Sequence, residues 1–417
     1  MSVYNFIGFG FFLGFSLLFV IPLLYSVGVG VLGSVTVGNG YFIFDSVSFY
    51  LILLIFFLGV YSLFSTFCRV GGGRSIFFLG LSLIFSFLCF CCNHSILFWC
   101  FYELSMLPLL YLIFCDSPYS ERFIAGWYFS VYLLFTSLPL ILILLYLSYV
   151  NGSVFFSLWS FYSDYIFIYV ALAFIFFTKV PLFPFHTWLP IVHAEATSIV
   201  SMFLSGYIMK LGILGIYRCT PFVFSGNFVG YLYLCCIFSV FFLVTASGEL
   251  DGKRWLAFLS LSHILIPFLG FFVCDWSGIN LSFFYCLGHG LSAGLVFGFL
   301  WFFYDAINTR NLVLLKSGVG GVYTTLVIVF GLLSLCSFPP TIQFFCEVFV
   351  LSSSTFSFVY LCFWCFYLFC AGLVPLILCG HILIRGESFE GSSFVVFSFG
   401  FLFLYLCFWC YLGVLYI

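Results

Sequence analysis

Charge is what this sequence has least of. Asp, Glu, Lys and Arg together make up only 6% of its 417 residues, whereas a soluble globular domain carries about 25%. The 11 basic and 13 acidic residues leave a formal net charge of −2, so there is no positive excess to hold nucleic acid. The shortage of charge excludes a water-soluble enzyme. The segment Met1–Pro22 has no basic residue at all, so we expect no cleavable signal or transit peptide.

Apolar residues take the place of the missing charge. They make up 65% of the chain, and the mean hydropathy is +1.31. Stretches such as 42–68 are apolar on every face, unlike a barrel strand, which alternates apolar and polar residues over about 10 positions. The sequence therefore predicts an all-α polytopic membrane protein. Its 67 Phe residues indicate a skewed nucleotide pool, which is typical of an organelle-encoded gene.

A membrane-spanning helix needs about 20 apolar residues. The sequence predicts about thirteen such segments, at 5–35 (one helix or two), 42–68, 75–93, 95–115, 123–150, 164–196, 198–217, 227–247, 253–273, 278–304, 318–352, 357–383 and 392–416. Segments 164–196 and 318–352 are too long for one straight helix, and both contain prolines. Because proline removes a backbone donor and clashes with the preceding turn, we expect two broken helices.

The basic residues predict the orientation. Eight of them fall on one side of the predicted spans: Arg69, Arg74, Arg122, Lys253, Arg254, Arg310, Lys316 and Arg385. Arg218 alone falls on the other side. The positive-inside rule assigns the richer side to the cytoplasm or the matrix, and the N-terminus is predicted to lie there too.

Four charged residues fall inside predicted spans: Glu103, Lys179, Lys210 and Glu347. A charge at the bilayer centre costs about 2.5–3.5 kcal/mol, so four unpaired charges would cost roughly 10–14 kcal/mol. Locked ion pairs are one explanation. An ion pathway is favoured, because ionisable residues inside membranes usually mark one.

Each half of the chain contains a broken segment with a charged residue close to its prolines. Lys179 precedes Pro181 in the first broken segment, and Glu347 follows Pro340 in the second. Interrupted helices at corresponding positions of two halves indicate a transporter site. We predict one membrane domain, 1–417, with inverted five-helix repeats at 75–217 and 227–383 and peripheral helices at 1–68 and 392–417.

Several runs together resemble one family over roughly residues 40–385. They are FYELSMLP at 101–108, KVPLFPFHTWLPIVHAEA at 179–196, the stretch 201–218 around Lys210, DGKR at 251–254, SLSH at 260–263, GHGL at 288–291 and PPTIQFFCE at 339–347. This pattern is similar to the antiporter-like, proton-translocating subunits of respiratory NADH dehydrogenase (complex I). An acid at Glu347 is typical of subunit 4, since subunits 2 and 5 carry Lys there. Thr197 and Pro340 depart from the family, which has Pro and usually Gly at these positions.

The resemblance implies a fold, a role and a location. The family usually has fourteen helices, so one N-terminal helix is expected to be missing here. The implied role is a proton-translocating membrane-arm subunit of NADH:ubiquinone oxidoreductase in the mitochondrial inner membrane, with the N-terminus in the matrix. Other membrane-arm subunits, with subunits 2 and 5 as neighbours, and lipids would be its partners. The chain would hold no cofactor or metal, since NADH, FMN, iron–sulfur clusters and ubiquinone belong to partner subunits.

The resemblance also implies roles for individual residues. Glu103 would modulate Lys179, Lys210 would be the central relay, and Glu347 would load the exit. Lysine suits such a relay because burial disfavours its charged form and an acidic neighbour restores it. His263 and His289 would bridge these groups through ordered water, since histidine titrates nearest neutrality.

The other polar residues give only weak predictions of function. His186, His193 and Glu195 lie near a helix break and form only a weak metal pattern, so we expect structural hydrogen bonds or a minor role in a path. Lys253 and Arg254 are predicted to anchor a span end at the membrane interface, and tuning of the second half-channel is the alternative. Solvated loop ends are expected at Asp45, Asp164, Asp275, Asp305, Glu387 and Glu390.

Some motifs are better explained by chance. The run from Gly28 to Gly33 matches a dinucleotide fingerprint but lacks the preceding strand. The CFWC runs at 362–365 and 407–410 lack basic neighbours that would activate a thiolate. Two other functions stay open: a cation/proton antiporter of the related multi-subunit type, and a structural membrane subunit whose charges are locked pairs.

Overall fold

The computed structural model describes residues 37–69, 73–160, 162–220, 228–274, 276–318, 322–384 and 393–413. The first half contains the hairpin β1 (Val37–Asn39) and β2 (Phe42–Phe44), then α2 (Ser46–Arg69), α3 (Gly73–Cys91), α4 (Ser95–Asp116), α5 (Arg122–Val150), η1 (Phe156–Leu158), η2 (Ser163–Tyr165), α6 (Ile166–Lys179), α7 (Trp188–Glu195), α8 (Ser198–Phe203), the π-helical turn η3 (Leu204–Ile208) and α9 (Met209–Cys219). The second half contains α10 (Val229–Gly248), α11 (Gly252–His263), α12 (Leu265–Val273), α13 (Trp276–Ile307), η6 (Leu312–Gly318), α14 (Val322–Leu335), α15 (Ile342–Ser353), α16 (Phe358–Ile384) and α17 (Ser393–Leu412).

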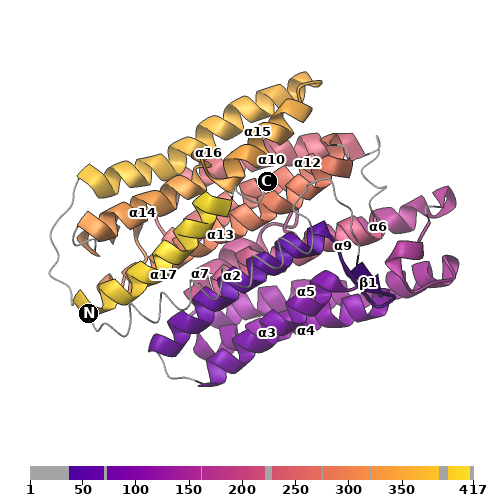
Figure 1. The fold of residues 1–417 in the computed structure, drawn as a ribbon, viewed down its shortest axis with the longest axis horizontal. Coiled ribbons are helices and arrows are strands. Elements are labelled where there is room, and N and C mark those ends of the chain that lie inside the picture. The colour runs from indigo at the N-terminus through magenta and orange to yellow at the C-terminus, as the bar shows by residue number, and fades with distance from the viewer. Residues whose placement is uncertain are drawn as a thin grey trace.

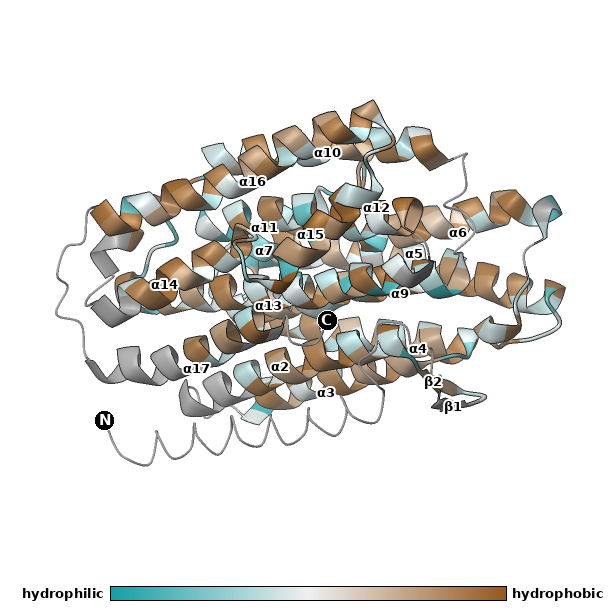
Figure 2. Cartoon of the chain, turned by 45° about the horizontal axis from the view of Figure 1, so that its top comes forward, coloured by the Kyte–Doolittle hydropathy of each residue, from teal (hydrophilic) through white to brown (hydrophobic). Residues whose placement is uncertain are grey.

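The predicted all-α membrane fold is confirmed. Eight helical segments among the described residues are long and apolar enough to cross a membrane. Apart from segment 5–35, which lies outside the described residues, every predicted span coincides with a helix or with a broken helix. Hydrophobic residues run along outer helices such as α10 and α14 (Figure 2), as a lipid-facing surface requires.

Helix α13 forms the centre of the bundle. Figure 1 shows α3, α4 and α5 on one side of it and α14, α15 and α16 on the other. It packs against α2, α8, α12, α14, α15 and α17. Three glycines at four-residue spacing make the contact with α2 close: a Cβ at Gly290, Gly294 or Gly298 would lie within 2.5 Å of atoms of α2. Small residues at this spacing let helix backbones approach in membranes.

Both predicted helix breaks are confirmed. In the first, α6 ends at Lys179 and α7 begins at Trp188; in the second, α14 ends at Leu335 and α15 begins at Ile342. Two other interruptions were not predicted. Segment 198–217 contains the π-helical turn η3, and segment 253–273 is divided at Ile264. Pro267 explains the second, because it cannot donate a hydrogen bond to the carbonyl of His263 four residues earlier.

The ends of the bundle bear on the predicted sidedness. At one end, β2 bridges to Cys92 and His94 bridges to Phe155. Arg218 lies at this end, where it pairs with Asp45 at 2.8 Å. The prediction that Asp45 is a solvated loop end is therefore wrong: the carboxylate caps α2 at Ser48 and binds the guanidinium.

The opposite end carries other basic residues. Helix α4 runs about 33 Å at 1.5 Å per residue, so Ser117 lies at the far end from His94. Arg122 donates to the carbonyl of Ser117 there.

Predictions that lie outside the described residues concern the N-terminus, the run from Gly28 to Gly33, Asp275, Arg385, Glu387 and Glu390.

Candidate functional site

Glu103 and Lys179 form a buried ion pair. The Lys179 Nζ lies 2.9 Å from Glu103 Oε1, and the side chains are only 3% and 12% exposed. Lys179 stands at the last residue of α6 because Pro181 and Pro184 prevent the helix from continuing. Its ammonium also lies 4.3 Å from the centre of the Tyr102 ring, which adds a cation–π contact. The pair that was expected from the sequence is thus assembled between α4 and α6.

Lys210 lies at the centre of the bundle, fully buried on α9. Its ammonium donates to the carbonyl of Ser205 within η3 and lies 3.0 Å from Nδ1 of His289 on α13. A π-helical turn changes the hydrogen bonding of its carbonyls and is frequent at functional sites. Lys210 and His289 can therefore exchange a proton directly.

Glu347 accepts three hydrogen bonds at one carboxylate oxygen. Ser337 Oγ lies 2.9 Å from Oε1, Tyr285 OH 3.1 Å and Tyr367 OH 3.3 Å. The two tyrosines also reach His263 Nδ1, at 3.2 Å for Tyr285 and 2.6 Å for Tyr367. Tyrosine hydroxyls therefore connect His263 to Glu347 without water.

The sequence prediction did not include these two tyrosines. Tyr285 stands four residues before His289 on α13, so helical spacing places both on one face and could have identified it. Tyr367 lies on α16, and nothing in its local sequence distinguishes it from the other tyrosines of that helix.

A short gap separates the two histidines. Their ring centres are 5.6 Å apart. Both rings are buried, and among the described residues neither His263 Nε2 nor His289 Nε2 has a hydrogen-bond partner. A buried polar atom without a partner costs about 1–3 kcal/mol. One bridging water would satisfy both nitrogens and close the gap.

The Glu103–Lys179 pair stands apart from this chain of side chains. No hydrogen bond among the described residues joins Lys179 to Lys210. Where α9 meets the end of α6, the contact is close and apolar: a Cβ added at Gly212 would lie 2.4 Å from Cγ2 of Val180. The six predicted residues therefore form two groups, a pair and a four-residue chain.

A second cluster joins the two halves of the chain at the end near Ser117. Lys253 Nζ donates to the Ala196 carbonyl at 2.6 Å and to Tyr119 OH at 3.3 Å. Arg310 lies 3.8 Å from the Tyr119 ring centre and 3.8 Å from Glu195 Oε1. Burial raises the pKa of Tyr119, although Arg310 lowers it, so the phenol stays neutral.

Lys253 is therefore not a membrane-interface anchor, and that prediction is wrong. Its side chain is buried, and its ammonium donates to the carbonyl of Ala196, the residue that follows the end of α7, an arrangement that helix ends favour. Arg254, the neighbouring residue, is exposed as expected.

The other candidate residues are spread along the broken helix. His193 is fully buried and stacks on Phe297 at 5.1 Å, and His186 lies against Phe242 at 4.6 Å. Thr197, where the family has Pro, adopts a φ of −61°, an angle that proline also adopts. The backbone angle of Thr197 is therefore compatible with either residue at this position.

Comparisons with known proteins identify the family of this chain. The family described as NADH:quinone oxidoreductase/Mrp antiporter, TM, matches residues 92–373. NADH-ubiquinone oxidoreductase chain 4 of Locusta migratoria is 30% identical, over 81% of this chain and 78% of the relative. The same chain of Rhipicephalus sanguineus is 28% identical, over 79% and 77%.

Solved structures share the fold. A chain of respiratory complex I from Thermus thermophilus superposes with a TM-score of 0.80 at 20% identity, over 96% of this chain and 90% of that one. A chain of the Mrp complex from Dietzia sp. gives a TM-score of 0.74 at 17% identity, over 93% and 75%. The chain therefore belongs to the family of NADH:quinone oxidoreductase/Mrp antiporter membrane subunits, and within it to the chain 4 type.

Proposed function

We propose that this chain moves protons across the mitochondrial inner membrane as a membrane-arm subunit of NADH:ubiquinone oxidoreductase. Electron transfer in other subunits drives the transfer, and this chain holds no cofactor of its own. Membrane-arm subunits 2 and 5 are its neighbours, and its N-terminus faces the matrix. Relatives named NADH-ubiquinone oxidoreductase chain 4 support the assignment to this complex, and the charge asymmetry of the loops supports the orientation.

One observation carries the proposal: titratable side chains are arranged in a row from Lys210 to Glu347 in the protein interior, with one gap between the two histidines. The order is Lys210, His289, His263, Tyr285 or Tyr367, and Glu347. Buried groups of this kind are expensive in a membrane and are retained where ions pass.

Each step has a donor and an acceptor. Lys210 gives a proton to Nδ1 of His289, which must then carry its own proton on Nε2. His289 passes that proton through one water to Nε2 of His263. His263 releases the proton on Nδ1 to a tyrosine hydroxyl, and the tyrosine gives its own proton to Glu347. Each histidine accepts a proton on one nitrogen and releases one from the other, so a single transfer leaves both rings in the opposite tautomer. The chain returns to its first state when both imidazoles have changed tautomer again, Glu347 has released its proton and Lys210 has been reloaded.

The pair Glu103–Lys179 has a different part in the proposal. While the carboxylate contacts the ammonium, the charged form of Lys179 is stabilised. Separation of the two side chains leaves a buried ammonium without its counter-charge, and Lys179 then sheds its proton. The charge state of the Glu103–Lys179 pair therefore affects Lys210 electrostatically rather than through a direct hydrogen bond.

A cation/proton antiporter is the second candidate, since the family includes Mrp antiporters. Sodium-like cations are held by several oxygen ligands, as hard cations in general are. The stretch from Lys210 through the two histidines offers an ammonium and imidazole nitrogens instead. Such groups carry protons well and bind hard cations poorly, which favours the proton.

Replacing Glu347 with Gln tests the proposal. Gln keeps an oxygen acceptor for Ser337 and both tyrosines but cannot take up a proton. A positioned proton-transfer group contributes about 10²–10⁴-fold, so we expect proton flux through this chain to fall at least about a hundredfold. The measurement is the ratio of protons pumped to NADH oxidised in vesicles that contain the assembled complex. Glu347→Asp, which keeps the carboxyl group, is the control, and an unchanged ratio in Glu347→Gln would remove Glu347 from the path.

A further inference from the structure

A hydroxyl chain outside the proton path ties the π-helical turn to its neighbours. Tyr207, within η3, lies with its hydroxyl 2.7 Å from Ser82 Oγ on α3. Ser82 Oγ donates in turn to the carbonyl of Ser105 on α4 at 2.6 Å. All three residues are fully buried. The chain therefore joins three helices at the level of the turn that precedes Lys210.

The direction of these hydrogen bonds is fixed. Ser82 has a single hydroxyl proton, which goes to the Ser105 carbonyl, so Tyr207 must be the donor to Ser82. The chain ends on a backbone carbonyl, which has no proton to pass on. The Tyr207–Ser82 contact thus cannot relay protons toward Glu103, and its effect must be on position.

The π-helical turn η3 sets the orientation of Lys210. Such a turn holds one extra residue, and in an α-helix each residue advances the helix by about 100°. The amide of Met209 bonds to the carbonyl of Leu204, five residues back, as this turn requires. If η3 relaxed to a regular α-helix, Lys210 would rotate by about 100° relative to α8 and leave His289.

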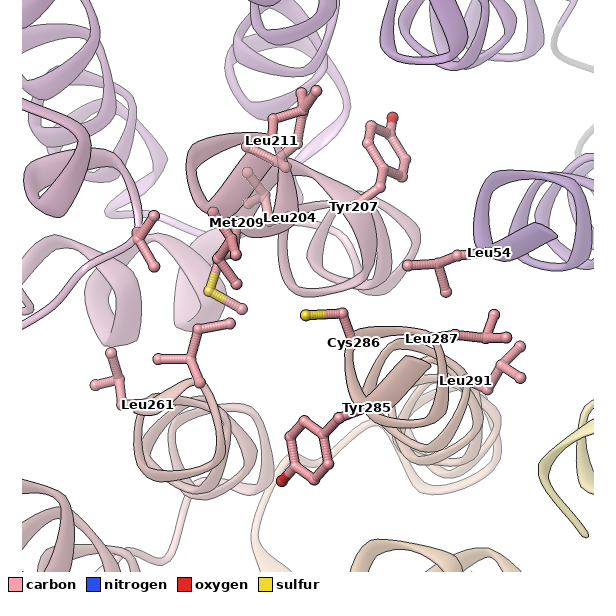
Figure 3. Packing of buried hydrophobic residues seen from close by; sticks show 14 of the residues in the cluster. Leu54, Leu204, Tyr207, Met209, Leu211, Leu261, Tyr285, Cys286, Leu287 and Leu291 are labelled. Atoms are coloured by element: carbon pink, nitrogen blue, oxygen red, sulfur yellow. The ribbon is translucent and has the colours of Figure 1, made fainter. Parts of the chain in front are cut away.

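The surrounding packing leaves Tyr207 as the polar anchor of the turn. Gly206 lies against α2, where a Cβ would meet Leu58 at 2.5 Å, and the Tyr207 ring packs on Phe203 at 5.1 Å. In Figure 3 the Tyr207 hydroxyl points away from Cys286 and Leu287 of α13. The hydroxyl therefore lies on the side of η3 that faces away from these two residues, where it meets Ser82 of α3.

We propose that Tyr207 is a positioning residue: its hydrogen bond to Ser82 holds the π-helical turn, and the turn holds Lys210 against His289. The inference rests on the proposed proton transfer by Lys210. It adds two residues, Tyr207 and Ser82, that touch no transferred proton.

Removal of either hydroxyl tests the inference. Tyr207→Phe and Ser82→Ala should each lower proton flux through this chain about fivefold, the factor that corresponds to the loss of one ordinary hydrogen bond, and the ratio of protons pumped to NADH oxidised measures the loss. The double variant should lose no more than the single ones, because both remove the same contact. Ser82→Thr, which keeps the hydroxyl, should restore the ratio.

Matched controls separate position from stability. Tyr360→Phe removes a fully buried hydroxyl that has no hydrogen-bond partner among the described residues, and it should pump normally at the same level of assembly. Normal pumping in Tyr207→Phe or in Ser82→Ala, or additive losses in the double variant, would overturn the inference. Lys210→Ala is measured alongside: if it too pumps normally, the proposed function itself fails, whereas loss in Lys210→Ala alone refutes only the role of Tyr207.

Discussion

Replacing Lys210 with Ala is expected to lower proton flux through this chain at least about a hundredfold, the contribution of one positioned proton-transfer group. Lys210 is the residue that links the π-helical turn to His289, and alanine leaves the histidine without a donor. The number of protons pumped per NADH in vesicles of assembled complex measures the loss. An assembled Lys210→Ala complex that keeps its normal ratio would refute the relay.

The variant Lys210→Arg separates charge from proton transfer. Arginine keeps the positive charge, but its pKa is above 12 and it does not release its proton in proteins. We therefore expect Lys210→Arg to pump as poorly as Lys210→Ala. If the charge served only to stabilise the fold, Lys210→Arg would pump at the normal ratio.

The second large effect concerns Glu103 and Lys179 together. In the double variant Glu103→Gln, Lys179→Met, neither position is left with an unpaired charge. Close buried charge pairs have coupling energies of about 1.5–7 kcal/mol, so the loss of their control should lower proton flux at least about tenfold. The same vesicle assay measures the ratio of protons to NADH.

The double variant also tests the structural explanation of the pair. A locked ion pair can be replaced by neutral side chains with little effect on stability, and removal of one partner alone costs about 3–5 kcal/mol. On that explanation the single variants assemble poorly and the double variant both assembles and pumps normally. Normal pumping by the double variant would therefore assign Glu103 and Lys179 to the fold alone.

The buried charges could be predicted from the sequence because they are conspicuous in an apolar chain. Charged residues are so rare here that four of them inside spans stand out, and the prolines beside Lys179 and before Glu347 mark the broken helices. The family resemblance then added the two histidines. The structure brings Lys210, His263, His289 and Glu347 into one chain and Glu103 and Lys179 into a pair.

Other parts of the site depend on tertiary packing that periodicity does not reveal. Tyr367 is one of several aromatic residues on α16, and only the fold brings its hydroxyl between His263 and Glu347. The π-helical turn has no local sequence marker besides Gly206. The place of Lys253 at a span end predicts an interfacial anchor, but the fold buries it and brings its ammonium to the carbonyl of Ala196, a residue distant in the sequence.

The central claim is that a hydrated link joins the two histidines between Lys210 and Glu347. An experimental map of the assembled complex, at a resolution that shows ordered water, tests it most directly. We expect one water within hydrogen-bonding distance of Nε2 of both His263 and His289. A dry contact between the rings, or rings turned away from each other with their nitrogens bonded elsewhere, would contradict the account.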